Sequence, residues 1–73
     1  MCRSIQKLRR PGIPASQAEI EAAALQFVRK VSGFRKPSQA NQAAFARAVA
    51  EVAASTGALL IELGVRLELE EVI

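Results

Sequence analysis

Apolar side chains recur every three or four residues in two stretches of the 73-residue chain, which is the pattern of two amphipathic helices. The first helix is predicted over residues 16–32 and the second over residues 38–63. Their expected contact rows are Ile20, Ala24, Phe27 and Val31 from the first helix, and Phe45, Val49 and Val52 from the second. The sequence therefore predicts an all-α fold: one small domain built on an antiparallel helical hairpin.

The predicted helix ends have local sequence signals. Ser16 and Glu19 have the spacing of a capping box at the start of the first helix. Gly33 can take the left-handed conformation that ends this helix, and Ser38 is a typical N-cap for the next. Residues 33–37 are therefore predicted to form the turn between the helices.

The second helix is predicted to be longer than the first, so that it overhangs by about 12 Å. The overhang carries Leu59, Leu60, Ile61 and Leu63. A second apolar stripe contains Ala43, Ala50, Ala54 and Ile61 and is interrupted by Arg47. A small domain without a disulfide or metal rarely leaves such side chains exposed, so we expect a homo-oligomer. The competing cover is the N-terminal arm, which offers Ile5, Leu8 and Ile13. Gly57 is the one position in this helix where a kink or break is expected.

The two ends of the chain do not follow a helical pattern. Pro11, Gly12 and Pro14 exclude a helix from the arm, residues 1–14. In the tail, residues 64–73, the alternation of Val65, Leu67 and Leu69 predicts a short extended segment. Its partner is either the arm or a symmetry mate, unless the end is frayed.

Charge is distributed unevenly along a chain whose formal net charge is +3. Residues 1–50 carry nine basic and two acidic side chains, whereas residues 51–73 carry one basic and five acidic ones. This asymmetry indicates either an anionic partner for the first part or attraction between the two ends.

The best candidate site is the basic turn, where cations and a capped helix start come together. The residues predicted to bind an anion there are Arg29, Lys30, Arg35, Lys36, Ser38 and Asn41. The arm adds a second basic segment that could follow nucleic acid, with Arg3, Lys7, Arg9 and Arg10.

Each of these features also has a plainer explanation. Basic residues favour the end of a helix through its dipole, so the turn could be only a solvated surface. Phe34 could stack on a base or simply cover the end of the hairpin. The arm could dock on the helices and keep its charges in water. A DNA-reading helix-turn-helix ranks low, because the predicted helices are antiparallel rather than crossed.

The composition argues against catalysis and against a cofactor. The chain has no histidine and a single cysteine, Cys2, so it lacks the usual general base and the ligands of a zinc site. Glycine-rich phosphate loops are absent as well. Cys2 is either an ordinary thiol or, once Met1 is removed, an N-terminal one. We predict a protein that is not an enzyme and uses no cofactor.

No membrane span or secretory signal is predicted. The most apolar run, "GALLIELGV", is interrupted by Glu62 and is shorter than a bilayer requires, and the basic N-terminus lacks an apolar core. A cytoplasmic location is therefore expected.

Three segments resemble a known family: "MCRSI", "EIEAAALQFVRKVSGFRKPSQANQAAF" and "AVAEVAASTGALLIELGVR". Together they are similar to domain-of-unknown-function family 2277, a group of small bacterial proteins, over residues 1–66. The matching positions are Met1, Cys2, Arg3, Ser32, Gly33, Lys36, Pro37, Ser38, Asn41 and Phe45. The segment "STGALL" and the tail after Arg66 depart from the family pattern. The resemblance implies a small helical protein and no activity, substrate or catalytic residue.

Two functions remain open. The first is a non-enzymatic binding module for an anionic partner such as nucleic acid, through the basic turn and arm. The second is a self-associating or protein-binding helical module. One contiguous basic face joining arm and turn would support the first, and a mixed surface with a large apolar patch the second.

Overall fold

The structure is a computed structural model, and it describes residues 5–68. The predicted roles of Cys2 and Arg3 and the third position of the predicted strand, Leu69, lie outside these residues. The described elements, in chain order, are β1 (Ala15–Ser16), α1 (Gln17–Ser32), a 3-10 helix η1 (Gln39–Asn41), α2 (Gln42–Glu62) and β2 (Leu67–Glu68).

Helix α1 begins and ends where its sequence signals place it. The Glu19 amide donates to Ser16 Oγ at 3.0 Å, and the Ser16 amide donates to Glu19 Oε1 at 3.0 Å. This reciprocal pair confirms the capping box. At the other end Gly33 has a φ of 80°, and its amide donates to the Arg29 carbonyl at 2.9 Å. The left-handed C-cap is therefore also confirmed.

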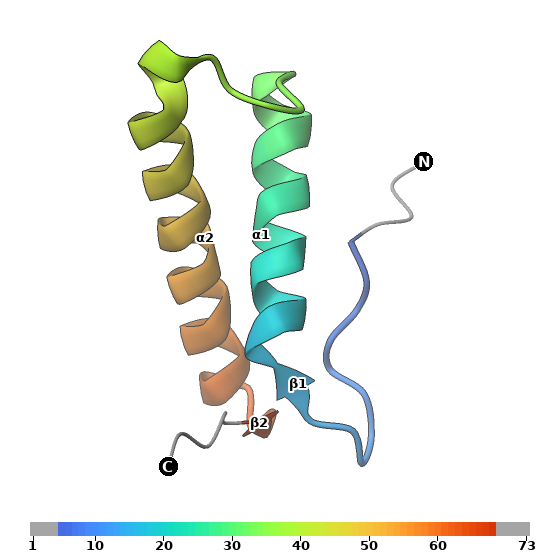
Figure 1. Ribbon diagram of the computed structural model, residues 1–73. Coiled ribbons are helices and arrows are strands. Elements are labelled where there is room, and N and C mark those ends of the chain that lie inside the picture. The colour runs from blue at the N-terminus through green and yellow to red at the C-terminus, as the bar shows by residue number, and fades with distance from the viewer. Residues whose placement is uncertain (1–4, 69–73) are drawn as a thin grey trace, which may run out of the picture.

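Helices α1 and α2 lie side by side as a hairpin (Figure 1). The predicted second helix starts later than expected, because residues 39–41 form η1 before α2 begins at Gln42. The Ser38 side chain makes no capping bond to a backbone amide, so its predicted capping role is wrong. Helix α2 then continues through Gly57 without a break.

A Schellman turn ends α2 and directs the chain back onto the hairpin. The Gly64 amide donates to the Ile61 carbonyl at 3.0 Å, and the Val65 amide donates to the Leu60 carbonyl at 2.8 Å. Gly64 has a φ of 85°, the left-handed value that this turn requires. Val65 consequently packs against the core instead of extending into solvent.

The tail pairs with the segment that leads into α1. Strands β1 and β2 are parallel, with Ala15 opposite Leu67 and Ser16 opposite Glu68. The Ala15 amide also donates to the Arg66 carbonyl at 3.0 Å. The tail therefore pairs within the same chain, with the two residues that directly follow the arm rather than with the arm itself. The chain is mostly helical with a short sheet rather than helical throughout.

The core lies where the arm, the two helices and the tail meet. Its buried side chains are Leu8, Ala15, Ile20, Ala24, Ala53 and Leu60. Three of these six are alanines, and Ile20 is the one large side chain below 2% exposure. Val49, Val52, Val65 and Leu67 pack around this cluster. The core of the monomer is therefore small, even for a chain of this length.

Two predicted core residues of α1 are exposed. Phe27 and Val31 are 47% and 70% exposed, whereas Ile20, Ala24 and Val28 are buried. The buried residues are spaced four apart and form the kind of ridge along which helices commonly pack. The predicted row, with Phe27 and Val31, alternated spacings of four and three. Phe27 lines a groove beside the arm, with Leu8 and Leu60 among its neighbours.

Candidate functional site

The basic turn lies at the end of the hairpin where α1 passes into α2 (Figure 1). Arg29 Nε donates to the Arg35 carbonyl at 3.1 Å, which ties the last turn of α1 to the loop. The Phe34 amide donates to Ser32 Oγ at 3.2 Å, and Phe34 remains half exposed. Four cations proposed for the anion site, Arg29, Lys30, Arg35 and Lys36, belong to the last turn of α1 and the loop that follows it, and their binding role stays a prediction.

The predicted polar donors of the turn bind each other. Asn41 Nδ2 donates to Ser38 Oγ at 3.1 Å, and the Asn41 amide donates to the Ser38 carbonyl at 2.9 Å. Both residues are exposed. The amides at the start of α2 are thus separated from Lys36 by a short 3-10 segment, which differs from the capped helix start that the sequence predicted.

The arm cations Lys7, Arg9 and Arg10 do not join the turn. Arg9 and Arg10 lie near the sheet, at the opposite end of the hairpin (Figure 1). The molecule measures 40 Å in its longest direction. The described residues therefore form two separate basic regions, and the contiguous basic face that would favour a single anionic interface is missing from this part of the chain.

Arg10 is held by an internal ion pair. Its Nη1 donates to Glu19 Oε2 at 3.1 Å, its Nη2 donates to Glu19 Oε1 at 2.9 Å, and Nη2 also reaches the Pro14 carbonyl at 3.2 Å. The predicted role of Arg10 as an exposed contact for nucleic acid needs this correction. The cause is a carboxylate nine residues further along the chain, which the fold brings beside it.

Glu19 therefore has two structural partners. The Arg10 guanidinium and, after it, the Ser16 amide lower the pKa of Glu19 from 4.5 to about 2. The hydrogen bonds to Glu19 likewise raise the pKa of Arg10. A bidentate pair of this kind fixes both direction and distance, so it joins the arm to the first turn of α1.

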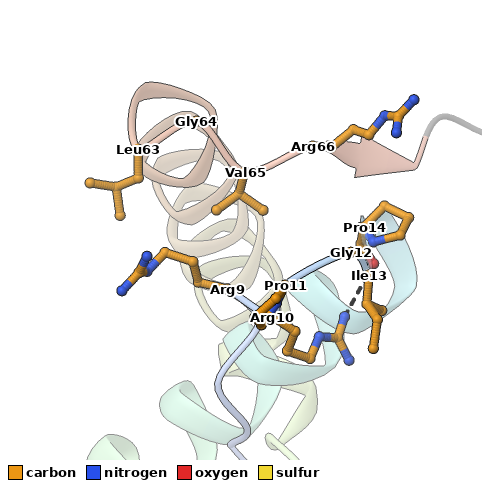
Figure 2. A pocket seen from close by; sticks show the side chains of 10 residues that line it. All are labelled: Arg9, Arg10, Pro11, Gly12, Ile13, Pro14, Leu63, Gly64, Val65 and Arg66. Atoms are coloured by element: carbon orange, nitrogen blue, oxygen red, sulfur yellow. Dashed lines mark hydrogen bonds between the residues drawn. The ribbon is translucent and has the colours of Figure 1, made fainter.

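A pocket of about 470 Å³ lies between the arm and the tail, next to this ion pair (Figure 2). Three arginines line it: Arg9 and Arg10 from the arm, and Arg66 from the segment before β2. Figure 2 shows Arg9 and Arg66 extending to opposite sides, while Arg10 turns toward Pro14. Sequence reasoning missed Arg66 and the capping role of Gly64, although a glycine at the end of an apolar helical run is a usable signal.

Apolar surface is exposed along both sides of the helix pair. One groove of about 480 Å³ is lined on α2 by Phe45, Val49, Ala50 and Ala54, and on α1 by Leu25. The predicted second stripe of α2, with Ala43, Ala50, Ala54 and Ile61, is exposed along its whole length.

The predicted interface residues at the end of α2 do not share one environment. Leu59, Ile61 and Leu63 are all more than half exposed, whereas Leu60 is only 7% exposed. Leu60 packs with Leu8 of the arm and with Ala15. The arm covers one of the four side chains and leaves three in solvent.

By length and composition, one described helix meets the criterion for a membrane span. It comprises Gln39–Glu62, 24 residues, with a mean hydropathy of 1.4 over its most apolar 18-residue window, of which 11% is buried. The expectation of no span rested on the shorter run that Glu62 interrupts. Among residues 5–68, no three His, Cys, Asp or Glu side chains gather where they could hold a metal ion.

Comparison with known proteins identifies a family but no individual relative. Neither the curated proteins nor the solved structures contain a match to this chain. The profile of one family matches residues 1–71, nearly the entire chain. The family resemblance of the sequence is thereby confirmed and extends beyond Arg66. The chain belongs to the family described as uncharacterized conserved protein, DUF2277.

Proposed function

We propose that the protein is a self-associating helical module, and that it acts through assembly rather than catalysis. One observation carries this proposal: of the 21 residues of α2, only Ala53 and Leu60 are buried. Most of an apolar helix therefore faces solvent in a single copy. Burial of a Leu or Ile side chain gains about 1.5 to 3 kcal/mol, so covering this helix is a strong driving force.

The shape of the exposed stripe suits a second copy of the same helix. Ala43, Ala50 and Ala54 are small and exposed, so another helix can approach closely there. The groove beside them offers Phe45, Val49 and Leu25 to a side chain from the partner. A two-fold arrangement presents the same stripe from both copies and leaves no growing end.

A bilayer is a poorer cover for this helix. Arg47 and Glu51 lie within the apolar segment, and α1, which packs against α2, carries Glu19, Glu21, Arg29 and Lys30. Insertion would require α2 to leave α1, or charges to enter the hydrocarbon, and each such charge costs about 2.5 to 3.5 kcal/mol. A second copy leaves α1 in place, and it requires only that Arg47, which interrupts the stripe, lie at the edge of the interface with its charge in water.

Sedimentation equilibrium tests this proposal. We expect a mass that is a multiple of 7.8 kDa at micromolar concentration. Ala50→Glu places a charge on the stripe and should shift the protein to monomer. Ala44→Glu is the matched control, because Ala44 is exposed on the same helix about 120° away from Ala50. A wild-type protein that remains a monomer throughout would refute the proposal.

The basic turn supports a second candidate function, the binding of nucleic acid or another polyanion. Among the described residues, none of the four cations Arg29, Lys30, Arg35 and Lys36 is in an ion pair. Replacing Arg35 and Lys36 by Ala should reduce the slope of log affinity against log salt by about 2 if both contact phosphate. Absence of binding by the wild type at low salt would eliminate this candidate.

A further inference from the structure

We propose that the pocket between the arm and the tail binds a small molecule that carries a carboxylate or a phosphate. The pocket lies at the sheet end of the hairpin, away from the basic turn (Figures 1 and 2). It is lined by the turn of the arm, residues 9–14, and by the end of α2, residues 63–66. The proposal does not depend on self-association.

The charged side chains that line the pocket, in the part of the chain that the structure describes, are all positive. Arg9 and Arg66 are exposed and, among the described residues, form no hydrogen bond or ion pair through their guanidinium groups. Both line the pocket, and in Figure 2 their side chains extend to opposite sides of it. Rotation of either exposed side chain toward the pocket would bring in a planar guanidinium group, which matches the geometry of a carboxylate or phosphate.

The third arginine, Arg10, has a structural role. Arg10 is committed to Glu19 and Pro14, but its Nε is buried and has no partner among the described residues. The Arg10 side chain thus holds the arm in place, and Glu19 balances its charge. Among residues 5–68, no acidic side chain lines the pocket.

The backbone around the pocket is fixed before any ligand arrives. The Ile13 amide donates to the Arg10 carbonyl at 3.2 Å across a turn whose Gly12 has a φ of 74°. Pro11 followed by a glycine with positive φ is the signature of a type II turn. The opposite wall is the Schellman turn at Gly64. The parallel pairing of β1 and β2 joins the two walls, so binding requires only the two exposed arginines to become ordered.

The size and walls of the pocket narrow the class of ligand. A volume of about 470 Å³ suits a small organic molecule. Pro11, Leu63 and Val65 give the walls apolar area. The ligand is therefore expected to combine one anionic group with an apolar body, because bare ions would leave this area unused.

NMR titration of the full-length ¹⁵N-labelled protein at constant ionic strength tests the proposal, with inorganic phosphate, acetate and benzoate as probes. The amide signals of Gly12 and Gly64 should shift and saturate. Benzoate should bind more tightly than acetate, because its ring can contact the apolar walls. Replacing Arg9 and Arg66 by Gln should weaken binding by roughly tenfold or more, through loss of charge-assisted hydrogen bonds.

The matched control is Arg35→Gln with Lys36→Gln, which removes two charges from the other end of the hairpin and should leave the titration unchanged. Because Arg9 and Arg66 are exposed, their variant should retain the dispersed spectrum of the folded protein. Linear, unsaturated shifts would show that ions associate only non-specifically. Shifts centred on residues 38–41, or a variant that binds as tightly as the wild type, would equally overturn the proposal.

Discussion

Among single residues, Glu19 joins a local contact to a distant one. It closes the capping box with Ser16 and receives both ends of the Arg10 guanidinium. The first contact is local and could be predicted from the four-residue pattern. The second joins positions nine residues apart, with two prolines and a glycine between them, and follows only from the fold.

The lowered pKa of Glu19 predicts loss of stability in acid. Because the folded-state pKa is about 2 and the ordinary value is 4.5, the unfolded chain binds the proton first as the pH falls. The contribution of this carboxylate to stability is complete above pH 4.5 and disappears as the pH falls from 4.5 toward 2. Urea denaturation across this interval should show Glu19→Gln with a weaker pH dependence than the wild type.

The control for this experiment is Glu21→Gln, which removes a carboxylate from the same helix without touching Arg10. Its pH dependence between 4.5 and 2 should resemble that of the wild type more closely than Glu19→Gln does. Equal behaviour of the two variants would mean that the Arg10–Glu19 pair does not form in solution.

Gly57 offers a stabilising substitution. It lies inside α2 at ordinary helical geometry, and an added Cβ would lie 3.9 Å from Ile20 Cδ1, an ordinary contact. Gly57→Ala should therefore raise the free energy of unfolding by about 1 kcal/mol, the difference in helix propensity. Gly64→Ala is the contrasting control, because its φ of 85° disfavours a side chain. A urea midpoint that falls for Gly57→Ala would contradict the geometry.

At the scale of elements, contacts close in sequence were predictable and contacts distant in sequence were not. Ser16, Glu19 and Gly33 define the ends of α1 through their own neighbours. The start of α2 was misplaced because Ser38 pairs with Asn41 in place of an amide. Which row of α1 is buried depends on how closely α2 approaches. The alternation of apolar residues in the tail predicted an extended segment but could not identify β1 as the strand that pairs with it. For the site, the cations of the turn were evident, whereas the role of Arg66 depends on pairing between the chain ends.

The choice of buried row in α1 leads to a prediction about two side chains. Ile20 is 1% exposed and Phe27 is 47% exposed, so the smaller side chain, Ile20, should contribute more to the free energy of unfolding. Ile20→Ala should cost about 2 to 5 kcal/mol of unfolding free energy, and Phe27→Ala about half of a full burial, roughly 1 to 1.5 kcal/mol. Urea denaturation ranks the two variants. A larger loss for Phe27→Ala would mean that Phe27 is buried in solution, as it would be in an interface between copies.

At the scale of the whole molecule, charge and apolar surface are arranged differently. The basic turn and the three arginines of the arm–tail pocket lie at opposite ends of the hairpin, and α2 runs between these ends (Figure 1). The exposed apolar stripe lies on α2, where Arg47 interrupts it. Assembly through α2 would leave both basic ends free, so oligomerisation and anion binding are compatible. An oligomer would then present each basic region more than once, which strengthens binding to any partner with repeated charges.

Assembly and folding should also be coupled, because the core of one copy is small. Only seven apolar side chains in the described chain are buried, and three of them are alanines. If association buries the stripe of α2, mass action stabilises the folded state, and the melting temperature rises with protein concentration. Ala50→Glu should lower the melting temperature and remove this dependence, whereas Ala44→Glu should keep it. A melting temperature that stays constant across a wide range of wild-type concentrations would mean that the small core alone supports the fold, and that α2 remains exposed in the native protein.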